Sequence, residues 1–214
     1  MLLYKYRSFD NFEYIADILL NERLYCAEFS SLNDPCEGFY LLHPPPTRYS
    51  IGEPQSTYTV NISDSNSSLF GLNKQVDLNR KRVCSLSAKL DDIRLWSFYA
   101  GNHTGIAIEI EIDAENHAKE VKYRETLPWY MVSLWNPQPP APEHILRYKF
   151  DLWVFEEEHR IITDAEYFPI QGKITKIYLG SRIDTKRHDL LKKLVPSIPI
   201  IETQIDPTQP KIIF

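Results

Sequence analysis

Three short segments carry polar side chains whose types could bind and transform a small molecule. They are Tyr6-Arg7-Ser8 with the later turn Asn33-Asp34-Pro35, then Cys84-Ser85-Leu86-Ser87, and then Glu156-Glu157-Glu158-His159-Arg160. A guanidinium can hold a phosphate through two parallel hydrogen bonds, and hydroxyls can orient a sugar. Carboxylates can stabilise positive charge as it develops in a transition state. Together the three segments contain the groups of a polar binding site.

The third segment is the most informative. We expect a strand from Phe155 to Thr163, in which Glu156, Glu158 and Arg160 project from one face and Glu157 projects from the other. Two neighbouring carboxylates repel each other unless a cation, a metal or a shared proton relieves them. A solvated sheet edge, or a salt-bridge ladder with Arg160, explains the pattern as well as a catalytic site does.

The elements that would position these residues follow from periodicity and from helix caps. Alternating isoleucines make 104–113 the clearest strand, with four isoleucines facing the core. We expect helices at 11–21 (with Asp10 and Glu13 as a capping pair), 91–100, 142–153 and 185–194. We expect strands at 2–7, 23–27, 83–87, 119–124 (beside 104–113), 155–163, 173–179, 198–205 and 211–214. The order predicts an α+β fold, a mixed or largely antiparallel sheet flanked by a few helices.

Two polar, proline-rich stretches interrupt this order. Residues 43–79 contain Pro44-Pro45-Pro46 and a serine-rich run, with one expected strand at 57–62, and about 125–142 is the second stretch. Residues 43–79 have too little apolar content for a second domain. We therefore expect one domain over 1–214, with both stretches mostly irregular, at the surface and near the site.

Composition restricts the partners and the location. The chain has 24 basic and 29 acidic residues, a net charge of −5, so nucleic acid is disfavoured as its main partner. The amino terminus becomes charged too early for a signal peptide, and no apolar run is long enough to cross a membrane. We expect a cytoplasmic protein. Its cysteines and histidines lack metal-ligand spacing, and His103 and His159 are expected at the surface.

The order of several short motifs resembles a widespread bacterial family known as domain of unknown function 2971. The motifs span almost the whole chain, although none is specific alone. They are the Tyr4-Lys5-Tyr6-Arg7-Ser8 start, Asn33-Asp34-Pro35 with Glu37, Cys84-Ser85-Leu86-Ser87, Leu95-Trp96-Ser97-Phe98-Tyr99-Ala100, Gly105-Ile106-Ala107-Ile108-Glu109, Trp153 with Glu156, Glu158 and Arg160, and Ile177-Tyr178-Leu179-Gly180. That family name implies no activity.

The chain more distantly resembles ADP-ribosyltransferases of the arginine-serine-glutamate type. Arg7, then Ser85 or Ser87, then Glu156-x-Glu158 occur in the order of that family's motifs, with Leu86 and Ser8 where the family usually has threonine and glycine. The resemblance implies that the arginine binds the phosphates of NAD and the serines orient the nicotinamide ribose. One glutamate would stabilise an oxocarbenium-like transition state and the other would activate the acceptor.

We therefore expect an NAD-consuming ADP-ribosyltransferase-like enzyme of a toxin or phage-defence system. NAD would be its substrate, and the sequence indicates no bound cofactor. Glu158 and Glu156 would be catalytic, and Arg7, Ser85, Ser87, Asn33, Asp34, Tyr99 and Arg160 would bind the substrate. One alternative is a metal-dependent phosphodiesterase using Asp34, Glu156 and Glu158, although the sequence shows no lysine beside these carboxylates. Another is a non-catalytic interaction module of a defence or toxin–antitoxin system. A nucleotide or a protein would be the partner, and the oligomeric state stays open.

Overall fold

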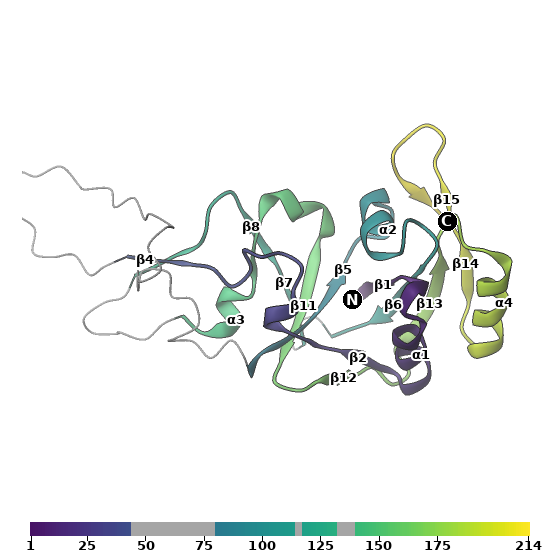
Figure 1. The fold of residues 1–214 in the computed structure, drawn as a ribbon, viewed down its shortest axis with the longest axis horizontal. Helices are drawn as coiled ribbons and strands as arrows, with labels where there is room; N and C mark the ends of the chain where they lie inside the picture. The colour runs from purple at the N-terminus through teal and green to yellow at the C-terminus, as the bar shows by residue number, and fades with distance from the viewer. Residues whose placement is uncertain (44–79, 114–116, 132–139) are drawn as a thin grey trace, which may run out of the picture.

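The computed structural model describes residues 1–43, 80–113, 117–131 and 140–214, and its centre is a mostly antiparallel sheet (Figure 1). In these residues the main sheet has the order β14-β13-β6-β1-β5-β11-β7, and β3 also pairs with β5. Its strands are β14 Ile200–Glu202, β13 Ile174–Leu179, β6 Ile106–Glu111, β1 Leu2–Arg7, β5 Arg82–Ser87, β11 Glu158–Thr163, β7 Ala118–Glu120 and β3 Ala27–Glu28. The predicted α+β class with helices beside a largely antiparallel sheet is confirmed.

The sheet is weakly joined between β1 and β5. Strand β1 pairs with β6 along its whole length, from Leu2↔Glu111 to Arg7↔Ile106. Its pairing with β5 consists of the single position Tyr4↔Ser87. The far end of β5 pairs with β3 instead. The two halves, β14-β13-β6-β1 and β5-β11-β7, thus lie side by side (Figure 1) but part beyond Tyr4.

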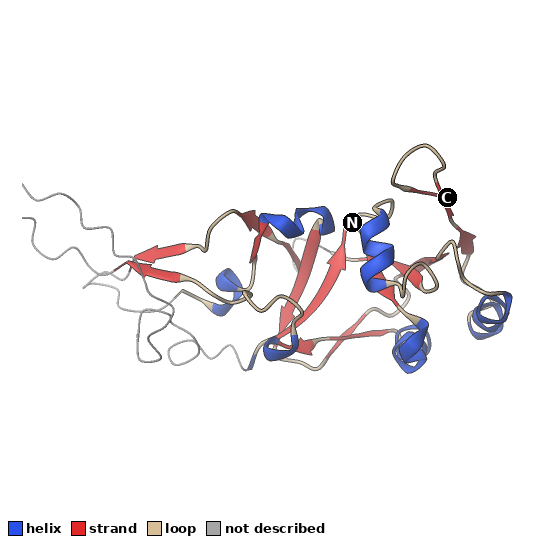
Figure 2. Cartoon of the chain, turned by 45° about the horizontal axis from the view of Figure 1, so that its top comes forward, coloured by secondary structure: helices blue, strands red, loops and turns tan. Residues whose placement is uncertain are grey.

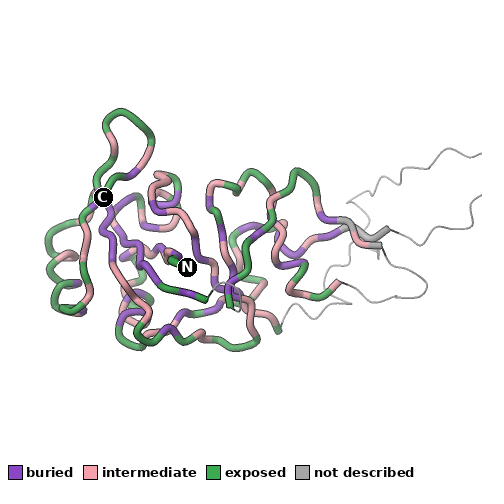
Figure 3. Tube along the Cα trace, turned by 180° about the vertical axis from the view of Figure 1, so that it is seen from behind, coloured by how far each residue is buried: buried purple, intermediate pink, exposed green. Residues whose placement is uncertain are grey.

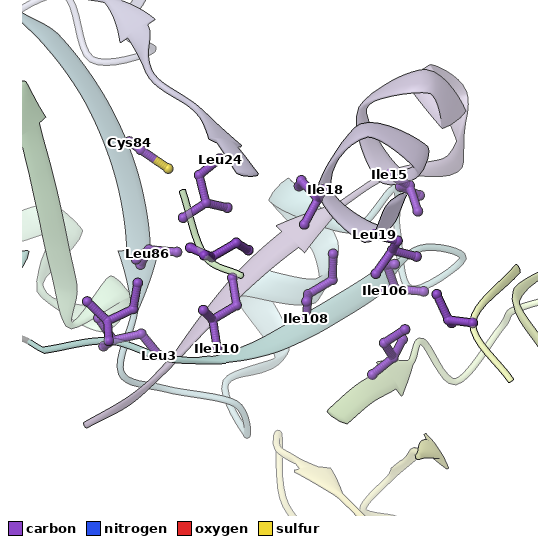
Figure 4. Close-up of a cluster of buried hydrophobic side chains, with 14 of the residues drawn as sticks. Leu3, Ile15, Ile18, Leu19, Leu24, Cys84, Leu86, Ile106, Ile108 and Ile110 are labelled. Carbon is purple, nitrogen blue, oxygen red and sulfur yellow. The ribbon is translucent and has the colours of Figure 1, made fainter. Parts of the chain in front are cut away.

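Two helices pack on opposite faces of the central sheet (Figure 2). Helix α1, Phe12–Asn21, packs Ile15 and Ile18 into the same cluster as Ile108 (Figure 4). Helix α2, Ile93–Tyr99, packs Trp96 with Ala107 on the other side. The four isoleucines of the 104–113 prediction are all buried, which confirms the face predicted for that strand. Helix α4, Thr185–Leu194, contributes buried Leu191 to the α1 side.

The burial of each element depends on its position in the sheet. The central strands are buried, while much of α4 and of the carboxyl-terminal hairpin is exposed (Figure 3). That hairpin consists of β15 Gln204–Ile205 and β16 Ile212–Ile213, so the predicted strand at 198–205 is divided between β14 and β15. The predicted strand at 23–27 is likewise divided, into β2 Arg23–Tyr25 and β3, and β2 pairs with β12 Tyr167–Pro169.

The predicted helix at 142–153 is wrong beyond its first turn. Helix α3 spans only Pro142–Ile145, with the proline at its first turn as expected. The chain then forms β10 Tyr148–Phe150, which pairs with β8 Lys122–Arg124, and a 3₁₀ helix η4 Asp151–Glu156. Pairing with a distant strand outweighs the local helical pattern here.

Other local expectations also change. Strand β7 pairs with β11, not with β6 as expected for 119–124. The Asp10–Glu13 capping pair is not formed. Ser8 instead caps a short 3₁₀ turn before α1, and Asn11 at the helix N-cap makes no side-chain capping bond.

Most residues of the two proline-rich stretches lie outside the described residues. Residues 44–79, including the expected strand at 57–62, lie outside the described residues, and so do 132–139. In the described part of the second stretch, Trp129–Met131 forms β9, which pairs with β4 Leu41–His43, so this part is not wholly irregular.

Candidate functional site

A cavity of about 330 Å³ lies where β1 and β5 part. Side chains from β1, β5 and β11 line it, together with residues from α1, α2 and the segment after β3. Most of the residues expected to form a site line this one cavity, namely Arg7, Asn33, Ser85, Ser87, Tyr99, Glu156 and Glu158. Asp34 and Arg160 do not line it.

The cavity reaches both faces of the sheet. Residues directly opposite each other in an antiparallel pair share a face, so Tyr4↔Ser87 and Glu158↔Ser87 place Ser87 and Glu158 on the α2 side. Alternation then directs Lys5 and Arg7 to the α1 side. Arg7 and Glu158 therefore project from opposite faces of the sheet. Arg7 and Glu158 line one cavity because their strands part.

The glutamates belong to a buried cluster of charges. Lys149 Nζ lies 2.7 Å from Glu156 Oε2, 3.3 Å from Glu158 Oε2 and 3.6 Å from Glu37 Oε1. Arg160 lies 2.7 Å from Glu158 through Nε and 2.7 Å from Glu37 through Nη1. Three carboxylates thus face two cations. The cluster therefore has a net charge of −1, unless one of the carboxyls holds a proton.

A change of backbone direction brings the two glutamates together. The strand predicted from Phe155 begins only at Glu158, and Glu156 is the last residue of η4. Between them Glu157 has φ 41° and ψ 51°, the left-handed region, and its exposed side chain contacts Lys89 at 3.0 Å. Glu156 and Glu158 therefore meet at Lys149 through this turn and not through alternation along one strand.

The two glutamates differ in acidity. Burial opposes the charge of Glu158, but Arg160 and Lys149 outweigh it and lower the pKa of this carboxyl to about 2. Burial raises the pKa of Glu156 above its ordinary value, against the opposing effect of Lys149. Burial also raises the pKa of Glu37. Glu158 thus stays ionised, whereas Glu156 and Glu37 are the carboxyls that can hold the proton.

A chain of hydrogen bonds runs from the cavity wall to Glu156. Asn33 Nδ2 donates to Tyr99 Oη at 3.0 Å, and Tyr99 donates to Glu156 Oε1 at 2.5 Å. Ser87 Oγ donates to the Glu156 carbonyl at 2.5 Å and accepts from the backbone N–H of Lys89 at 2.9 Å. The hydroxyl of Ser87 is therefore engaged in fixing η4 against β5. Ser85 also lines the cavity, and its side chain hydrogen-bonds Glu158, which helps to lower the pKa of that carboxyl.

Two of the expected substrate-binding residues have other roles. Asp34 Oδ1 accepts from the backbone N–H of Cys36 at 2.9 Å, which makes it a turn-forming residue. Arg160 is 0 % exposed, so it cannot contact a substrate, and it holds Glu158 in place instead.

Lys149 is the residue that the sequence prediction missed. The expectation that no lysine lies beside the carboxylates is wrong for Glu156 and Glu158, because Lys149 contacts both of them and Glu37 as well. Its signal was a lysine between Tyr148 and Phe150, alternating with aromatic residues as in a strand, which the helix assigned to 142–153 concealed. His103 was also misplaced, since it is buried and its Nε2 lies 3.1 Å from Ser97 Oγ.

The α1 side of the cavity carries the opposite charge. Lys5 Nζ donates to the Ser85 carbonyl at 2.7 Å, across the gap between the parted strands. Arg7 Nε is buried without a hydrogen-bond partner. No carboxylate in the described ranges pairs with Lys5 or Arg7. Burial lowers the pKa of both cations, so an anion in the cavity would relieve them.

The described residues show neither a metal-binding cluster nor a membrane-spanning helix. They contain no group of three or more histidine, cysteine or acidic side chains arranged to hold a metal ion. None of their helices is long and apolar enough to span a bilayer.

Comparison with known proteins gives no relative: no family model, curated protein or solved structure matches this chain. The two family resemblances stay predictions.

Proposed function

We propose that this chain binds NAD in the cavity and breaks the bond between nicotinamide and ribose, transferring ADP-ribose to water or to another acceptor. The observation that carries the proposal is that Arg7, Ser85 and the pair Glu156 and Glu158 come from distant parts of the chain and line one cavity. Packing alone gives a buried arginine and a buried carboxylate pair no reason to share a cavity.

The charges support a division of roles. The nicotinamide leaves with the electron pair of its bond, and positive charge develops at the ribose carbon. Glu158 is ionised and held by Arg160, so it can stabilise that charge without reorganising. Glu156 has a raised pKa and can take the proton of the attacking hydroxyl as the new carbon–oxygen bond forms. Arg7 binds the diphosphate.

The same charges disfavour the metal-dependent phosphodiesterase. A divalent cation prefers carboxylates that carry free negative charge. Glu156 and Glu158 already contact Lys149, and Arg160 takes both oxygens of Glu158. Asp34, the third donor of that alternative, does not line the cavity. A metal would have to displace two buried ion pairs.

Two measurements test the proposal. Purified chain incubated with NAD should release nicotinamide, measured by chromatography. NAD should also raise the melting temperature, because a ligand that binds only the folded state stabilises it. Stabilisation by Mg²⁺ or Mn²⁺ without NAD would favour the phosphodiesterase. No release and no stabilisation by any of the three would favour the interaction module.

A further inference from the structure

The half of the cavity on the α1 side has a composition that catalysis at Glu158 does not use. Tyr14 of α1 and Tyr25 of β2 line the cavity while remaining 51 % and 37 % exposed. Lys5 and Arg7 of β1 line the same cavity and are less exposed than the two tyrosines. Two aromatic rings at the mouth therefore accompany two cations deeper in the wall.

The two cations, Lys5 and Arg7, favour a ligand that carries concentrated negative charge. Lys5 and Arg7 are two residues apart on β1, so their side chains lie on the same side and repel each other. Lys5 donates to the Ser85 carbonyl and interacts with the Cys84 thiol but pairs with no carboxylate in the described residues, and Arg7 Nε has no hydrogen-bond partner. A phosphate group supplies both the charge and the acceptor oxygens that a guanidinium and an ammonium need.

The exposed rings of the two tyrosines favour an aromatic base that stacks on them next to that phosphate. A buried tyrosine usually packs on both faces, but Tyr14 and Tyr25 keep large exposed areas beside the cavity. Tyr25 already packs edge-on against Tyr167, with ring centroids 5.8 Å apart, which fixes the orientation of its ring. An aromatic base stacks favourably on exposed rings of this kind, whichever base it is.

We infer that the α1 side of the cavity is a subsite for a nucleoside 5′-phosphate, with Lys5 and Arg7 on the phosphate and Tyr14 and Tyr25 against the base. The inference rests on the proposed function and extends it, because it orients the dinucleotide through the gap in the sheet. The adenosine half lies on the α1 side, and the nicotinamide ribose lies on the α2 side, next to Glu156 and Glu158.

Calorimetric titration of the full chain with AMP and with nicotinamide mononucleotide tests this orientation. The double variant Tyr14→Ala/Tyr25→Ala should weaken AMP binding about tenfold or more, and leave nicotinamide mononucleotide within about twofold. Tyr14→Phe/Tyr25→Phe should restore AMP binding, because stacking needs the ring and not the hydroxyl. Phe98→Ala removes a ring that is 63 % exposed and does not line the cavity, so it serves as the matched control.

The outcomes separate the subsite from the proposed function. Equal AMP affinity in the double alanine variant and in Phe98→Ala would overturn the subsite, as would no AMP binding at millimolar concentration, even if NAD were cleaved. Tyrosine-dependent AMP binding without nicotinamide release would support the subsite and contradict the proposed reaction. Matched melting temperatures of the variants would confirm that folding is intact.

Discussion

Arg160 holds both oxygens of the Glu158 carboxylate, Oε1 from Nε at 2.7 Å and Oε2 from Nη2 at 2.9 Å. The two residues are two positions apart on β11, so the same strand that carries the glutamate also carries the group that fixes it. Nη1 of Arg160 donates to the Leu146 carbonyl at 2.8 Å. The carboxylate is therefore oriented before any ligand enters, a requirement for electrostatic stabilisation of a transition state.

Glu158→Gln should reduce nicotinamide release from NAD by at least about a hundredfold, the size of loss seen when one preorganised group of this kind is removed. The amide keeps the shape of the side chain but loses the negative charge that stabilises the oxocarbenium-like state. Single-turnover release of nicotinamide, with circular dichroism to check folding, measures the effect.

Glu157→Gln is the matched control for that substitution. Glu157 is exposed and its contact with Lys89 lies at the surface, so the change should leave nicotinamide release within about twofold. Equal losses in both variants would remove Glu158 from the mechanism and would leave the interaction module as the better explanation of the chain.

Arg160→Met should destabilise the protein by about 3–5 kcal/mol, because it leaves the buried carboxylates Glu37 and Glu158 with Lys149 as their one remaining cation in the cluster. Urea unfolding measures the free energy. Arg94→Met breaks an ion pair with Asp92 in which the arginine is 54 % exposed, and should cost no more than about 1 kcal/mol. Similar losses in the two variants would mean that the charge cluster is not closed to solvent.

Acid should weaken the folded state through Glu158. The pKa of this carboxyl is lowered from 4.5 to about 2 on folding. Between these values the unfolded chain binds the proton and the folded chain does not, so the contribution is complete above pH 4.5 and is lost as the pH falls towards 2. Urea unfolding of the native protein and of Glu158→Gln should converge over this range, and a constant difference would contradict the assignment.

Ile108→Ala should cost about 2–5 kcal/mol, because Ile108 is fully buried between β6 and α1 and its removal leaves a cavity. Leu20→Ala on the exposed side of α1, where the side chain is 59 % exposed, should change stability by about 0.5 kcal/mol or less. Urea unfolding compares the two. A small loss at Ile108 would show that the core around β6 can collapse.

The sequence predicted those parts of the fold in which local pattern and burial agree. The alternation at Ile106, Ile108 and Ile110 identified both the strand and its buried face, and 185–194 was predicted with the observed helix boundaries. The failure at 142–153 has a physical cause. Tyr148–Phe150 becomes a strand only because β8, more than twenty residues earlier, is available to pair with it.

The site was predicted in its residue types but not in its geometry. Arg7, Ser85 and Glu158 were identified by type and order, and they line one cavity. That Arg7 reaches it from the opposite face of the sheet depends on β1 and β5 pairing at one position only, and strand pairing is not encoded in either segment alone. Lys149 lies only seven and nine residues before Glu156 and Glu158, but a helix predicted over 142–153 cannot show the turns that bring them together.

The acid side of the pH–rate profile should depend on Lys149, which lowers the pKa of Glu156 from the value that burial would otherwise give. In Lys149→Gln that opposing charge is gone, so Glu156 should hold its proton to higher pH. If Glu156 accepts the proton of the attacking hydroxyl, the acid limb of the pH–rate profile for nicotinamide release should move to higher pH. Lys89→Gln, which removes a half-buried cation paired with Glu157, should leave the acid limb in place. A limb unchanged in both variants would exclude Glu156 as the base, and a downward movement in Lys149→Gln would contradict the sign of the interaction.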